Sequence, residues 1–76
     1  MYKVLIVDDE RLIRMTLQNM LDWKELNCDV VAAVKDGIEA YGVFQKVHPD
    51  LIITDLKMPQ MDGIELIRKV KEERAD

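Results

Sequence analysis

The chain has 76 residues, of which 49% are hydrophobic and 34% are charged, and its formal net charge is −4. A chain of this length forms at most one domain, and such a domain buries only about 60% of the surface that its unfolded chain exposes. The acidic balance argues against direct contact with nucleic acid, which requires basic surface. We expect a cytoplasmic protein without membrane contact. The single cysteine, Cys28, excludes an intramolecular disulfide, and no segment approaches the roughly 20 apolar residues of a membrane span.

The first half of the chain predicts a strand, a helix and a second strand. Residues 3–7 are rich in Val, Leu and Ile, a pattern typical of a strand that is covered on both faces. From Glu10 to about Asp22, apolar residues recur at helical spacing. They are Ile13, Leu17, Met20 and Leu21. We expect Met15 and Met20 to fill the core. A second apolar run, residues 30–34, predicts the next strand.

A second helix and a third strand follow. Asp36 can cap a helix, and Glu39, three residues later, can bond back to the N–H of the cap. His48 and Pro49 end this helix, because the residue before a proline is pushed out of the α region. Residues 51–54 are apolar and predict the third strand.

The last element is a third helix. A loop is expected over residues 56–61. Asp62 then repeats the capping signal, and the apolar residues that follow it recur at helical spacing. The complete order is βαβαβα. This order predicts parallel strands joined by right-handed crossovers.

Three acidic residues stand where predicted strands end. Asp8 and Asp9 follow the first strand, and Asp55 follows the third. The carboxyl ends of parallel strands meet at one edge of a sheet, where ligands bind, so three carboxylates would surround one point. One ionised pair at ~5 Å costs roughly 3 kcal/mol at an effective dielectric of ~20. A cation is therefore expected at this point. Mg2+ fits such a site, because it is usually bound by one or two carboxylates together with phosphate oxygens and water.

A purely structural interpretation stands beside this one. Asp8 and Asp9 could simply cap the first helix, and an aspartate such as Asp55 at a strand end is usually a turn or cap residue. Spacing alone does not separate the two interpretations. The coincidence of acidic residues at two strand ends, together with the loop that contains Met58 and Pro59, favours the metal site.

Two stretches resemble the receiver domain of bacterial two-component response regulators. One is the strand Val4–Val7 followed by Asp8, Asp9 and Glu10, and the other runs from Pro49 to Gly63. The resemblance implies an α/β fold with a flavodoxin-like, doubly wound parallel sheet, here reduced to βαβαβα with strand order 2-1-3. Residues 1–76 would then be a partial receiver domain, with the first three βα units of the family's five and without the fourth and fifth.

The resemblance also implies roles for the acidic residues. Asp55 is expected to accept a phosphoryl group from a sensor histidine kinase. Asp9 would bind Mg2+ directly, Asp8 would bind it mainly through water, and the backbone carbonyl of Lys57 would supply another oxygen. The chain would not be an enzyme but a phosphoacceptor that assists its own phosphorylation and dephosphorylation.

The segment from Leu21 to Leu26 resembles receivers that precede AraC-type helix-turn-helix output domains. The resemblance therefore implies that the full-length protein regulates transcription through a DNA-binding output domain that these 76 residues do not include. The family also uses a Ser or Thr at the end of its fourth strand and a Lys at the end of its fifth. Since these residues have no counterpart here, we expect signalling to be impaired in this chain.

A second hypothesis is an interaction module without phosphotransfer. The third strand would be an edge of the sheet, and an apolar exposed edge pairs readily with another chain. We therefore expect a homo-oligomer that forms through residues 51–54.

Overall fold

The computed structural model describes residues 1–55 and 62–73. Its elements follow the predicted βαβαβα order: β1 (Tyr2–Val7), α1 (Arg11–Met20), β2 (Cys28–Val34), α2 (Gly37–Val47), β3 (Leu51–Thr54) and α3 (Gly63–Glu73). The loop expected over residues 56–61 lies outside the described residues. No helix of the described part is long and apolar enough to cross a bilayer.

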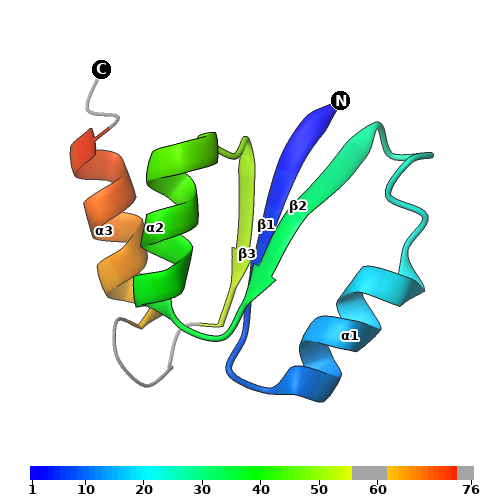
Figure 1. Cartoon of the computed structure of the whole chain (residues 1–76), viewed down its shortest axis with the longest axis horizontal. Coiled ribbons are helices and arrows are strands. Elements are labelled where there is room, and N and C mark those ends of the chain that lie inside the picture. Colours follow the sequence, from blue (N-terminus) through cyan, green and yellow to red (C-terminus); the bar gives the residue numbers. More distant parts are fainter. Residues whose placement is uncertain (56–61, 74–76) are drawn as a thin grey trace.

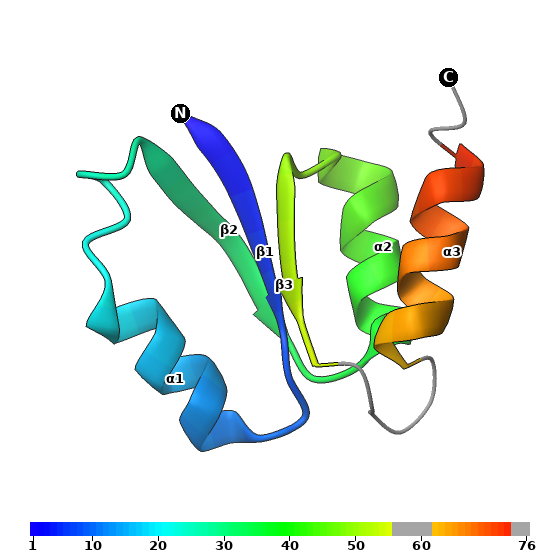
Figure 2. The same cartoon turned by 180° about the vertical axis from the view of Figure 1, so that it is seen from behind.

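The three strands form one parallel sheet in the order β2-β1-β3, which confirms the strand order expected from the resemblance. Helix α1 covers one face of the sheet, and α2 and α3 lie side by side on the other (Figures 1 and 2). Strand β1 is central, and Val4 to Val7 are all buried. A run that is apolar on both faces is stable only where both faces are covered. The composition of β1 therefore explains its central place.

Strand β2 begins at Cys28, earlier than the apolar run over residues 30–34 predicts. The additional residues pair with Tyr2 and Lys3 of β1. The register shifts between Val4 and Leu5, which pair with Val30 and Ala32. The pairing partner, and not the local composition, sets where this strand begins.

The main core lies between the sheet and the helices α2 and α3. Leu5, Val7, Ala40 and Leu66 form its buried cluster. The two helices are also joined at their outer side by Tyr41. Its hydroxyl donates a hydrogen bond to Glu73, and the ammonium group of Lys69 lies 5.7 Å from the centre of its ring.

Helix α1 packs far less closely, and none of its residues is buried. The prediction that Met15 and Met20 fill the core is wrong, because their side chains are 44% and 72% exposed. Among the described residues, α1 alone covers its face of the sheet (Figures 1 and 2). The flanks of this helix therefore have no neighbouring helix to pack against. The C-terminal end of α1 is held by Trp23, whose Nε1 donates a hydrogen bond to the carbonyl of Leu17 at 3.2 Å.

Both predicted caps are present. The Asp36 carboxylate accepts a hydrogen bond from the N–H of Glu39 at 2.9 Å, and Asp62 accepts one from Glu65 at 3.0 Å. Helix α2 ends where predicted, because His48 takes a left-handed conformation with φ 53° immediately before Pro49. These local signals set where α2 begins and ends and where α3 begins.

Replacing Asp36 with alanine is expected to lower the free energy of unfolding by about 1 kcal/mol, because the N–H of Glu39 loses its acceptor. Urea unfolding followed by circular dichroism measures this loss. Asp36→Asn is the matched control, since asparagine caps helices about as well as aspartate. Equal losses in both variants would show that the charge, and not the cap, matters at this position.

Candidate functional site

The parallel pairing of β1 with β3 brings two acidic segments to one edge of the sheet. Val7 is paired with Thr54, so Asp8 and Asp55 leave the sheet side by side. Backbone hydrogen bonds continue past the strands. The N–H of Asp8 donates to the carbonyl of Val34 at 3.0 Å, and the N–H of Asp55 donates to the carbonyl of Val7 at 3.2 Å. The backbone of both residues is therefore fixed by the sheet.

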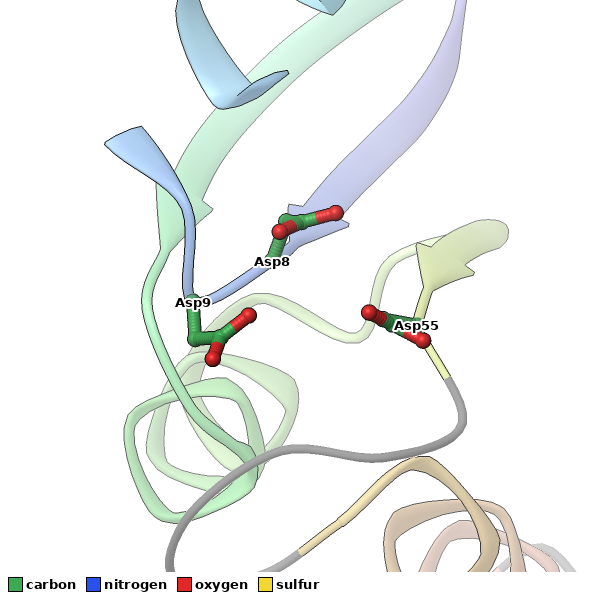
Figure 3. A group of neighbouring side chains, drawn as sticks. All are labelled: Asp8, Asp9 and Asp55. Atoms are coloured by element: carbon green, nitrogen blue, oxygen red, sulfur yellow. The ribbon is translucent and has the colours of Figure 1, made fainter. Parts of the chain in front are cut away.

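The three predicted site aspartates come together at this edge. Asp8, Asp9 and Asp55 each offer one carboxylate oxygen, and these oxygens all lie within 4.8 Å of one another. Figure 3 shows the Asp9 and Asp55 side chains pointing toward each other across a gap. Asp8 is buried, whereas Asp9 and Asp55 are exposed. Lys57, the fourth residue expected at the site, lies outside the described residues.

The donor set fits a small, hard divalent cation. Mg2+ holds its oxygen ligands at about 2.1 Å in octahedral geometry, so oxygens on opposite sides of one ion lie about 4.2 Å apart. The three carboxylate oxygens lie within 4.8 Å of one another, close enough for one such ion to be held directly or through water.

The two neighbouring aspartates differ in how they are held. The Asp8 carboxylate accepts a hydrogen bond from the N–H of Glu10 at 2.9 Å, so part of its acceptor capacity closes the turn before α1. No hydrogen bond or ion pair of the Asp9 carboxylate is recorded within residues 1–55 and 62–73. The structural interpretation therefore holds in part for Asp8, as a turn residue. It gives no role to Asp9.

Arg14 also contacts the site, although no pattern in the sequence indicated it. Nη1 of Arg14 donates a hydrogen bond to the backbone carbonyl of Asp8 at 2.7 Å. The only signal in the sequence was its position in the helix that follows the acidic pair. Periodicity reports apolar residues, and it carries no information on where a cation on the same helix points.

Comparison with known proteins agrees with this architecture. The REC domain of AraT, a response regulator from Geobacillus stearothermophilus, has a TM-score of 0.92 at 40% identity, over 99% of this chain and 58% of that one. A two component transcriptional regulator AraC from Clostridium phytofermentans has a TM-score of 0.89 at 39% identity, over 100% of this chain and 61% of that one. An uncharacterized response regulatory protein from Staphylococcus epidermidis is 40% identical over 72 residues, which make up 95% of this chain.

A parallel, doubly wound sheet with this strand order defines the class of the fold as flavodoxin-like, here with acidic residues at the carboxyl edge of the sheet. Residues 4–76 match the response regulator receiver domain, and the chain belongs to this family. Receiver domains are phosphoacceptors and generally bind Mg2+. The chain spans only 29% of the length of the Staphylococcus epidermidis relative.

Mg2+ is expected to stabilise this protein, because binding to the folded state alone adds about 1.4 kcal/mol when the ion is at ten times its dissociation constant. Asp9→Asn should remove most of this gain, since it takes away a carboxylate of the cluster. Thermal unfolding with and without Mg2+ measures the difference.

The control variant is Asp29→Asn, which removes an exposed acidic residue near the other end of the sheet. It should keep the full response to Mg2+. A loss of the response in both variants would mean that Mg2+ acts through general charge screening and not at the acidic cluster.

Proposed function

We propose that Asp55 accepts a phosphoryl group from a sensor histidine kinase, with Mg2+ held by Asp8, Asp9, Asp55 and the backbone carbonyl of Lys57. The observation that carries the proposal is the convergence of three carboxylate oxygens within 4.8 Å at the carboxyl edge of the sheet. Such an arrangement is repulsive without a cation. Membership of the receiver family supports the assignment of the phosphoacceptor.

In phosphoryl transfer the protein contributes mainly by positioning the reacting groups and by stabilising their charge. A carboxylate oxygen of Asp55 forms a bond to phosphorus while the bond between phosphorus and the donor breaks, and the product is an acyl phosphate. Bound Mg2+ supplies positive charge against the phosphoryl oxygens. Asp55 is exposed, so a donor can approach it, and its backbone is anchored to Val7 at 3.2 Å.

We further propose that residues 1–76 correspond to the first three βα units of a receiver domain within a longer cytoplasmic transcriptional regulator. The support is the coverage of 58% of the AraT domain and the likeness to a regulator described as AraC. An AraC-type DNA-binding domain would then be the output. The 76 residues alone would accept phosphate at Asp55 without relaying it, and they would make no direct contact with DNA.

Incubation with acetyl phosphate and Mg2+ is expected to add one phosphoryl group to the protein, measured as an increase in intact mass. Asp55→Asn should abolish the addition, because an amide is not a nucleophile of this kind. The matched control is Asp50→Asn, at the opposite end of β3, which should still be phosphorylated. Phosphate retained in Asp55→Asn would assign the reaction to another residue.

A second candidate function is self-association through β3. This strand pairs with β1 on one side, and no other described strand pairs with it. Leu51 leaves 48% of its surface exposed on this strand. An open apolar edge of this kind recruits a further strand, so we propose that the chain forms oligomers through β3.

Leu51→Lys is expected to shift the chain toward the monomer, because a lysine on an edge strand opposes pairing. Size-exclusion chromatography with light scattering measures the mass. Ile38→Lys is the matched control: it adds the same charge at an apolar residue that is 54% exposed on α2. A clean monomer in the unmodified chain would refute the self-association proposal.

A further inference from the structure

Arg14 reaches back from α1 to the segment that carries the acidic pair. Its Nη1 donates to the Asp8 carbonyl at 2.7 Å, a short, charge-assisted hydrogen bond. The N–H of Asp8 donates to the carbonyl of Val34 at 3.0 Å. The backbone of Asp8 is thus held on one side by β2 and on the other by α1.

Arg14 is half-buried, and in this it differs from Arg11, the other cationic residue of α1. Arg11 is exposed and has no recorded hydrogen bond or ion pair within the described residues. Apart from Leu17, Arg14 is the one residue of α1 that is not exposed. The hydrogen bond from Arg14 to the Asp8 carbonyl is itself partly buried, so water competes with it less than with a bond at an exposed position.

The bonded carbonyl belongs to the peptide that joins Asp8 to Asp9. Because a peptide unit is planar, fixing the carbonyl oxygen of Asp8 also fixes the N–H and the Cα of Asp9 in that plane. The other side of Asp9 is held as well, since the N–H of Glu10 bonds to the Asp8 carboxylate at 2.9 Å. These two hydrogen bonds restrict the backbone on both sides of Asp9, and so the direction in which its side chain leaves the backbone.

This direction matters because the carboxylates of the cluster repel one another in the absence of a cation. Their oxygens lie within 4.8 Å, and Asp9 faces Asp55 (Figure 3). Asp9 is exposed and could relieve the repulsion by turning into solvent together with its backbone. A hydrogen bond that holds the preceding peptide opposes this movement, and the positive charge of Arg14 offsets part of the repulsion.

We propose that Arg14 is a positioning residue for the metal site: by fixing the Asp8–Asp9 peptide, it keeps the Asp9 carboxylate directed at Asp55 in the metal-free protein and so raises the affinity for Mg2+. The inference rests on the proposed function, because it assumes that the cluster binds a divalent cation. Partners that orient metal ligands typically change metal affinity by about 10- to 100-fold when they are removed.

The experiment compares Arg14→Met with Arg11→Met in the full 76-residue chain. Both variants remove one positive charge from the first half of α1, but only Arg14→Met removes the hydrogen bond to Asp8. Titration with Mg2+ alone, followed by the backbone amide signals of Asp9 and Glu10 in NMR spectra, gives the dissociation constant. We expect affinity to fall about tenfold in Arg14→Met. Affinity in Arg11→Met should stay within a factor of about two, since only an exposed charge is lost.

A second readout needs no metal. Amide hydrogen exchange at Glu10 should be faster in Arg14→Met than in Arg11→Met, because the turn that its N–H closes is less firmly held. Exchange at Ile6 in the central strand should be the same in both variants, which shows that the sheet is intact. Equal Mg2+ affinity and equal Glu10 exchange in the two variants would overturn the proposal.

Arg14→Lys covers the case in which Arg14→Met does not fold. Lysine keeps the positive charge but has a shorter side chain without the guanidinium fork, so we expect Arg14→Lys to bind Mg2+ more weakly than Arg11→Met does. Equal Mg2+ affinities in these two variants would also overturn the proposal. Failure of the unmodified chain to bind Mg2+ would contradict the proposed metal site instead. The Glu10 exchange rates would in that case still decide whether Arg14 positions the turn.

Discussion

The parallel register of β1 with β3 is the constraint on which the site depends. It places Val7 beside Thr54, and the residues that follow each strand then emerge at the same edge. A shift of this register by one residue would turn the side chains of β3 to opposite faces and move Asp55 away from Asp9. The apolar residues of β1 are buried in this register, so a shift that uncovered them would also lose their burial free energy.

Three carboxylates lie at this edge and repel one another, and local hydrogen bonds oppose their moving apart. The Asp8 backbone is bonded to Val34 in β2 and to Arg14 in α1, while its carboxylate closes a turn with Glu10. Asp9 takes no part in these contacts. One aspartate of the pair therefore shapes the backbone, and the other is left available to bind a cation.

Packing differs strongly between the two faces of the sheet. Helices α2 and α3 enclose a core that includes Leu5 and Leu66, whereas α1 has no buried residue. The apolar stripe predicted α1 correctly, but it led to the wrong expectation that Met15 and Met20 lie in the core. A helical period shows that one side of a helix is apolar. It does not show how much neighbouring structure is present to cover that side.

The sequence by itself determined the order of the elements, the caps at Asp36 and Asp62, the end of α2 at His48, and the placement of acidic residues after two strands. These features follow from interactions between residues close together in the chain, which local patterns report directly. Only the tertiary structure decided that the carboxylate oxygens of Asp8, Asp9 and Asp55 lie within 4.8 Å, and that Arg14 bonds to the Asp8 carbonyl. Asp9 and Asp55 are far apart in sequence, so their separation in space depends on strand pairing, and the direction of Arg14 depends on how α1 packs against the sheet.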